Sequence, residues 1–232
     1  MDGQGRGRHL RDGVPDDLAG NCVLTSDGAL LGSFVSRDGR DLYVYRAPKF
    51  PQPGPADLPL GPLDVPVFIP DSFDAGLIFH GAGGLTTNNV FPIMAVDAAD
   101  NLHLVFSDQL NIYLMSCPAG ANPTLASSWT KPLPLNAPRV AGFEFTRTTV
   151  LPWIRAGAPG KVAAMWYGTD AVGVPDSPVF EQQQVPWKII YAQVENALAE
   201  QPDVFLDVAS TQGGGVIHRG QICNRGLGCP SG

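Results

Sequence analysis

The 232-residue chain lacks the features that mark nucleic-acid-binding and membrane-spanning proteins. Asp and Glu outnumber Lys and Arg, and the net charge of −7 argues against a nucleic-acid partner, which would require a basic face. No run of about 18 apolar residues is present, so no membrane span is predicted. Residues 1–20 have no apolar stretch of the kind found in a signal peptide, so an export signal would have to lie upstream of them.

The chain also lacks the commonest sequence signals of enzymes. There is no Gly-x-Ser-x-Gly motif of the serine hydrolases. The Gly-rich segment that contains His80 follows an apolar run but matches neither a phosphate-binding loop nor a dinucleotide-binding fingerprint. No cofactor is therefore predicted.

Charged residues make up only 16% of the chain, whereas Gly 27 and Pro 22 are abundant. Gly permits backbone conformations with positive φ, and Pro removes a donor from a strand ladder, so this composition favours short strands joined by turns. An all-β class follows. Residues 1–19, which carry a small basic cluster among glycines, are expected to be a disordered tail.

Cysteine is scarce, with four in the chain. Cys223 and Cys229 bracket a glycine-containing loop that would close a small disulfide ring. The other interpretation is half of a zinc site, but only His218 is near enough in sequence to add a ligand. We favour the disulfide, which predicts an oxidising compartment, secreted or at the cell surface. For Cys22 and Cys117, free thiols and a second bridge both remain open.

An internal repeat is the most informative feature of the sequence. Residues 90–106 and 150–166 share an order of apolar strand, turn and apolar strand ending in an aromatic residue. Pro92 aligns with Pro152 at an offset of 60 positions. The same order is visible, more weakly, from Cys22 onward.

A third apolar strand follows in both copies. Aligning Ile112 with Ile190 gives an offset of 78, so the later copy carries an insertion of 78 − 60 = 18 residues. The inserted sequence, around Val172–Pro186, is rich in Pro and Gln and is expected to form a surface loop.

Repeated units of three or four antiparallel strands are typical of the blades of a β-propeller. Three units are too few for the usual closed ring of four to eight blades, so an incomplete or truncated ring is expected. A β-sandwich is the alternative architecture, but it does not require a fixed offset. The predicted propeller spans 20–232, with approximate units at 20–47, 90–135 and 148–208 and a further unit beginning near 216.

Residues 95–108 resemble the inner hairpin of a blade in the sialidase-like (BNR or Asp-box type) β-propellers of secreted bacterial proteins. Residues 217–229 are similar to a blade junction of some members. The resemblance covers roughly 20–232 and implies an exported module with a glycan or an extracellular protein as partner.

Active members of that family are retaining glycosidases. They use a Tyr nucleophile assisted by Glu, an Asp acid/base and three Arg that clamp the substrate carboxylate. This sequence has only a remnant of an Asp-box at Ser127–Thr130, and Tyr45–Pro48 does not reproduce the Arg-Ile-Pro motif. No catalytic residue is transferred. We expect a non-catalytic module that binds through loops on one rim, with an exo-sialidase-type hydrolase completed by residues outside this chain as the alternative.

Four residues are candidate ligand contacts on that rim. His80 lies in the Gly-rich segment after a predicted strand, where loops carry binding residues. The other three are close enough in sequence to share a rim: Arg139, Arg147 and Arg155.

Oxygen-bearing side chains cluster between the two strands of the first clear repeat copy. Asp97, Asp100 and Asn101 could contribute to a calcium site, but such loops carry more acidic ligands, so a turn is the favoured interpretation. No metal site is predicted. His103 alternates with apolar neighbours and is expected to be structural.

Overall fold

A computed structural model describes seven stretches of the chain, and the structural statements below concern those residues. They are 18–35, 41–46, 74–80, 91–108, 110–136, 147–209 and 215–223. Their regular structure is almost entirely β-strand, which confirms the all-β class. No helix in these stretches is long and apolar enough to cross a membrane.

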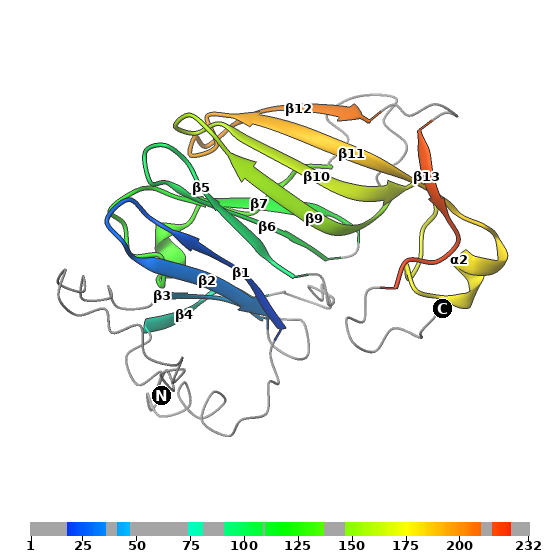
Figure 1. The fold of residues 1–232 in the computed structure, drawn as a ribbon, viewed down its shortest axis with the longest axis horizontal. Coiled ribbons are helices and arrows are strands. Elements are labelled where there is room, and N and C mark those ends of the chain that lie inside the picture. The colour runs from blue at the N-terminus through cyan, green and yellow to red at the C-terminus, as the bar shows by residue number, and fades with distance from the viewer. Residues whose placement is uncertain are drawn as a thin grey trace, which may run out of the picture.

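The strands form three antiparallel sheets, each made of strands that follow one another along the chain (Figure 1). The first sheet contains β1 (Leu18–Leu24), β2 (Leu30–Val35), β3 (Asp41–Arg46) and β4 (Asp74–His80). The middle sheet contains β5 (Ile93–Val96), β6 (Leu102–Ser107), β7 (Ile112–Cys117) and β8 (Leu133–Pro134). The last sheet contains β9 (Thr148–Ala156), β10 (Val162–Thr169), β11 (Pro186–Glu195) and β12 (Asp203–Val208), with β13 (Val216–Arg219) also paired to β11.

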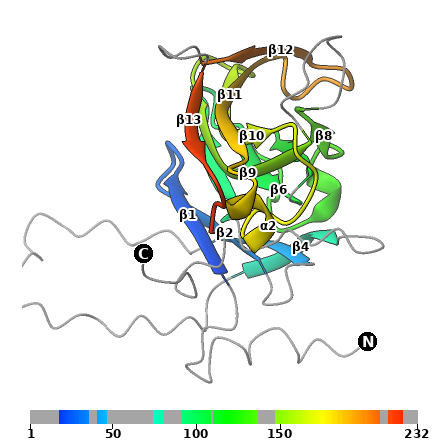
Figure 2. The same cartoon turned by 90° about the vertical axis from the view of Figure 1, so that its right-hand side faces the viewer.

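The three sheets are stacked, with the middle sheet between the other two (Figures 1 and 2). Every side chain of β6 is buried, because the first sheet covers one face of the middle sheet and the last sheet covers the other. Leu104 and Phe106 pack toward the first sheet, whereas Val105 packs toward the last. Within the described residues the sheets form an open stack and do not close into a ring.

Contacts between β1 and β5 fix the first sheet against the middle one. The side-chain amide of Asn21 both donates to the carbonyl of Met94, at 2.9 Å, and accepts from its N–H, at 2.6 Å. A Cβ atom at Gly20 would overlap the carbonyl oxygen of Pro92, so this close approach of two backbones requires glycine.

Strand register confirms the repeat offset of 60. Ile93 pairs with Val105 in the middle sheet, and Trp153 pairs with Met165 in the last sheet. The hairpin turns also correspond, with left-handed backbone at Asp100 (φ 63°) in one and at Gly160 (φ 69°) in the other. Asp tolerates this conformation better than most residues with a side chain, which makes the turn possible without glycine.

The predicted offset of 78 for the third strand is wrong by one residue. Leu114 pairs with Val105, and Tyr191 pairs with Met165, so the offset is 191 − 114 = 77. The inserted segment therefore has 77 − 60 = 17 residues. Successive strand residues face opposite sides, so the one-residue error had assigned Ile190 to the wrong face of its sheet.

The insertion is more than a surface loop. It contains the short helix α2 (Pro178–Gln182), and Phe180 of that helix is buried. Phe180 packs against Trp187 with ring centroids 5.9 Å apart, and Val150 and Val185 complete a small separate core. A second helical turn, the 3₁₀ segment η1 (Ala126–Ser128), lies between β7 and β8.

Candidate functional site

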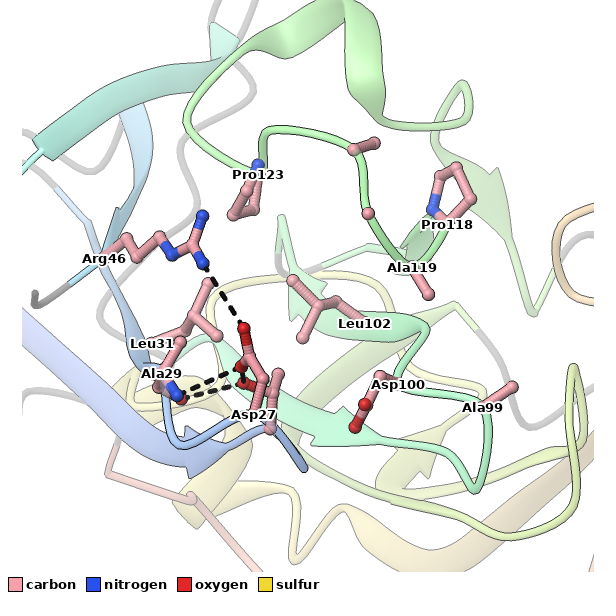
Figure 3. Close-up of a pocket in the computed structure, with 13 residues that line it drawn as sticks. Asp27, Ala29, Leu31, Arg46, Ala99, Asp100, Leu102, Pro118, Ala119 and Pro123 are labelled. Atoms are coloured by element: carbon pink, nitrogen blue, oxygen red, sulfur yellow. Dashed lines mark hydrogen bonds and ion pairs between the residues drawn. The ribbon is translucent and has the colours of Figure 1, made fainter. Parts of the chain in front are cut away.

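A pocket opens along one edge of the stack, where turns of the first and middle sheets meet (Figure 3). We call it the rim pocket. Its walls come from the β1–β2 turn, the β5–β6 turn and residues 118–123 after β7, with Arg46 at the end of β3. Leu31 and Leu102 supply apolar lining. The cavity volume of about 290 Å³ suits a single side chain or one sugar residue rather than a larger ligand.

The β1–β2 turn carries the first carboxylate of the rim pocket. Asp27 Oδ1 accepts a hydrogen bond from the Thr25 hydroxyl at 2.6 Å and one from the Ala29 N–H at 3.2 Å. Gly28 adopts φ 81°, which closes the turn without steric cost. The Asp27 carboxylate is therefore fixed by its own turn.

The β5–β6 turn carries the second carboxylate. Asp100 accepts hydrogen bonds from the backbone N–H of Ser26, at 2.9 Å, and from the Ser26 hydroxyl. Because Ser26 belongs to the first sheet and Asp100 to the middle sheet, these bonds join the two walls of the pocket.

Arg46 contributes the guanidinium of the rim pocket. Its Nη2 lies 3.9 Å from Asp27 Oδ2, and the two side chains are 41% and 47% exposed. An ion pair so open to solvent contributes at most about 1 kcal/mol to stability. The guanidinium has five N–H donors in a planar fork, and this loose contact leaves donors to face a ligand.

A buried chain of three polar side chains lies behind the pocket in the middle sheet. His103 Nε2 is 3.2 Å from Asp97 Oδ2, and His103 Nδ1 is 2.9 Å from the Ser116 hydroxyl oxygen. A carboxylate only accepts, so Nε2 carries the imidazole proton and Nδ1 accepts from Ser116. Asn101 connects this chain to the pocket wall, since its Oδ1 accepts the Ala119 N–H at 2.9 Å.

Among the side chains of Asp97, His103 and Ser116, that of Asp97 makes the most hydrogen bonds. Its Oδ1 accepts the N–H groups of Ala99 and Asn101, at 2.8 and 3.0 Å. Its Oδ2 accepts the Asn101 amide at 2.9 Å and the N–H of Gly160, in the last sheet, at 2.7 Å. Burial would raise the pKa of Asp97, but the bonds from Gly160, Asn101, Ala99 and His103 lower it to about 2.

The buried environment of His103 favours its neutral form. Burial lowers its pKa, although the hydrogen bond and the charge of Asp97 act in the opposite direction. The Ser–His–Asp order resembles a nucleophile with its general base, but all three side chains are buried, and those of His103 and Asp97 are 0% exposed. No substrate reaches Ser116. These three hydrogen-bonded side chains therefore join the middle sheet to the last one and do not perform nucleophilic catalysis.

Asp97, Asp100 and Asn101 thus sit in a turn. Their oxygens accept hydrogen bonds from backbone and side-chain donors of the turn and of its neighbours. In the part of the chain that the structure describes, no three His, Cys, Asp or Glu side chains are grouped to hold a metal ion.

Of the four predicted ligand residues, the two whose side chains are described, Arg147 and Arg155, do not line the rim pocket. Arg147 immediately precedes β9 and Arg155 lies near its end, both exposed. Eight strand residues at about 3.3 Å each separate them by roughly 26 Å, so they cannot clamp one carboxylate. The backbone of His80 pairs with Asp41 at the end of β4, and its side chain is not described. Arg139 lies outside the described residues.

Cys22 and Cys117 are free thiols, one exposed and one buried. No disulfide joins two cysteines of the described stretches. Cys229 lies outside them, so the ring with Cys223 stays a prediction. Burial raises the pKa of Cys117 to about 11, which makes this thiol a core residue rather than a nucleophile.

Sequence reasoning missed the residues that build the rim pocket. Ser26-Asp27-Gly28 is recognisable as a turn, but nothing in its sequence indicates that Ser26 meets Asp100, which is 74 positions away. Arg46 follows a predicted strand, at a place where no clamp is expected, and the segment Tyr45–Pro48 does not reproduce the Arg-Ile-Pro motif.

Comparison of the chain with protein-family models, with curated proteins and with solved structures found no match.

Proposed function

We propose that this chain is an exported, non-catalytic β-propeller module of the sialidase-like kind that binds a glycan through the rim pocket. The observation that carries the proposal is the pocket itself: an open cavity with two fixed carboxylates, Asp27 and Asp100, opposite the guanidinium of Arg46. Carboxylates accept hydrogen bonds from sugar hydroxyls, and a guanidinium donates hydrogen bonds to them.

The charge of the pocket supports a neutral sugar. Two carboxylates against one guanidinium leave the pocket negative, in a chain whose net charge is −7. A sialic acid carboxylate would need the three-Arg clamp of the family, whereas Arg46 is the one guanidinium among the described residues that line this cavity. A loop of an extracellular protein that presents hydroxyl or cationic side chains is the second candidate ligand, favoured by the same charge.

The stack supports the propeller part of the proposal. The main path of each sheet is a meander of consecutive strands, and β5, the first strand of the middle sheet, contacts both β1 and β9. Blades of a propeller have the same connectivity and pack through their faces around an axis. The inaccessible Ser116–His103–Asp97 chain supports a module without catalysis.

A glycan array probed with the full chain tests the proposal. We expect binding to neutral glycans, a loss of at least about tenfold in affinity for Arg46→Ala and for Asp27→Asn, and no change for the matched exposed arginine variant Arg219→Ala. Binding that persists in Arg46→Ala would contradict the assignment of the pocket. Turnover of a fluorogenic sialoside, inhibited by a sialic acid analogue, would contradict the absence of catalysis.

A further inference from the structure

A second cleft lies in the last sheet, at the end where β13 and α2 lie (Figure 1). One wall comes from Leu151 of β9, Tyr167 of β10 and Ile189 of β11. The other comes from Ile217 of β13 and from the segment 218–223. All residues that line the cleft belong to the described stretches. Its volume of about 610 Å³, against about 290 Å³ for the rim pocket, fits a molecule larger than a single side chain.

The insertion fixes the wall formed by the segment 218–223. The Gly220 N–H donates to the Val185 carbonyl at 3.0 Å, and the Ile222 N–H donates to the Pro175 carbonyl at 2.9 Å. Tyr167 and Ile222, one from each wall, both pack against the small separate core beside α2. The cleft is therefore formed before any ligand arrives, as ligand sites usually are.

Leu151 has a backbone conformation that leucine rarely adopts. Its φ of 55° lies in the left-handed region. The pairing of β9 with β10 shifts between Met165 and Tyr167, which places a β-bulge at Leu151. Glycine takes the left-handed position of such a bulge without steric cost, so the bulge explains the φ but not the leucine. A cleft wall does require a side chain here, and strain that the fold does not need is typical of a ligand site.

The lining of the cleft indicates an uncharged ligand with a polar edge. No Asp, Glu, Lys or Arg is among the described residues that line it, in contrast to the rim pocket. His218 Nε2 donates to the Gln221 carbonyl at 2.9 Å, so in the neutral imidazole Nδ1 is left as an acceptor. Within the described residues, neither this nitrogen nor the Tyr167 hydroxyl nor the Gln221 side chain has a hydrogen-bond partner.

We infer that this cleft binds an uncharged ring compound that carries a hydroxyl group. The rings contact Leu151 and Ile189, and the hydroxyl donates to His218 Nδ1. Removal of apolar surface from water supplies most of the affinity, and the hydrogen bond selects the ligand that has a donor. The cleft shares no residue with the rim pocket, so the inference does not depend on the proposed binding of a glycan.

Equilibrium dialysis of the full chain against 2-naphthol tests the inference. The matched probe is 2-methoxynaphthalene, which has the same rings but no hydroxyl donor. We expect saturable binding of naphthol. His218→Phe keeps a ring in place and should weaken naphthol binding by about fivefold to tenfold while leaving methoxynaphthalene binding unchanged, because only the hydroxyl loses its partner. Equal losses for the two probes, or no binding of naphthol to wild type, overturn the inference.

Leu151→Gly separates binding from folding. Glycine relieves the left-handed strain, so the unfolding midpoint should stay unchanged or rise. Both probes should bind at least about threefold more weakly, because part of the apolar wall is lost. Unchanged affinity in this variant would contradict the assignment of the cleft. Leu151→Ala replaces it if the glycine variant does not fold.

Two control variants show that the effects belong to this cleft. Leu110 is 43% exposed, close to the 39% of Leu151, but it lies in the β6–β7 turn, so Leu110→Gly should leave the affinity for both probes unchanged. Arg46→Ala weakens glycan binding under the proposed function and should not change naphthol binding. A loss of naphthol binding in either control would contradict the inference, whereas a failure of glycan binding alone would contradict only the proposed function.

Discussion

The middle and last sheets are two copies of one repeat, yet they differ in burial. All six residues of β6 are buried, whereas β10 alternates between buried and exposed residues along most of its length. Val105 and Met165 occupy the same position of the repeat, and one is 0% exposed and the other 44%. Burial in this fold is therefore a property of the place of a sheet in the stack, and the repeat unit alone does not determine it.

The same comparison explains the buried polar chain. In the middle sheet Ala95, His103 and Ser116 form one registered row, and the corresponding row of the last sheet is Arg155, Ala163 and Gln193. In the row of the middle sheet, which the last sheet covers, His103 and Ser116 are hydrogen-bonded to each other. The row of the last sheet is exposed, and water can solvate its side chains. A polar group that loses water needs a fixed partner, so the network occurs only where a second sheet covers it.

The largest expected effect is on the free energy of unfolding, when a charge is placed at the equivalent positions Val105 and Met165. Val105→Asp buries a carboxylate without a partner between two sheets and should lower the free energy of unfolding by roughly 3–5 kcal/mol. Met165→Asp places the same charge on an exposed face and should change it by about 0.5 kcal/mol or less. Urea unfolding of both variants measures the difference. Equal losses would contradict the difference in burial between the two positions.

Low pH should weaken the contact between the middle and last sheets. The folded state lowers the pKa of Asp97 from 3.8 to about 2, so its stabilisation is present above pH 4 and lost as pH falls toward 2. The amount lost is about 2 kcal/mol. The lowered pKa of His103 reduces the stability at a higher pH than Asp97 does. Below pH 6.5 the unfolded state takes up a proton on this histidine more readily than the folded state.

Asp97→Asn checks the assignment to Asp97. The difference in unfolding free energy between wild type and Asp97→Asn should shrink as pH falls from 4 to 2, because the wild-type carboxylate takes up its proton over that range. A difference that stays constant over this range would place the acid sensitivity elsewhere in the chain.

The smallest effect compares thiols of the first and middle sheets. Cys22 is exposed, whereas Cys117 is buried with a pKa of about 11, so at pH 8 only about one Cys117 in a thousand is a thiolate. A disulfide-exchange reagent should label Cys22 rapidly and Cys117 only after unfolding. Unfolded protein should show two thiols before reduction and four after it if Cys223 and Cys229 are bridged, whereas four before reduction would exclude the ring. Mass spectrometry of the labelled chain counts them.

Much of the strand pattern was predictable from the sequence. The abundance of Gly and Pro, the hairpin turns and the offset of 60 all depend on local chemistry, and the all-β class and the correspondence of Ile93 with Trp153 follow from them. The third strand was misaligned by one residue because its apolar run, Ile189–Ile190, offers two matches to Ile112 and only hydrogen-bond register chooses between faces.

The sequence by itself determined which segments become strands and turns, because backbone preferences and side-chain alternation act over a few residues. Tertiary structure alone decided that β4 completes the first sheet although 27 residues separate it from the end of β3, and that Ser26 donates hydrogen bonds to Asp100 from one sheet to the next. It also decided which face of each sheet is covered. Such pairings join residues far apart in the chain, and no local pattern specifies them, because they arise when stacked sheets remove apolar surface from water.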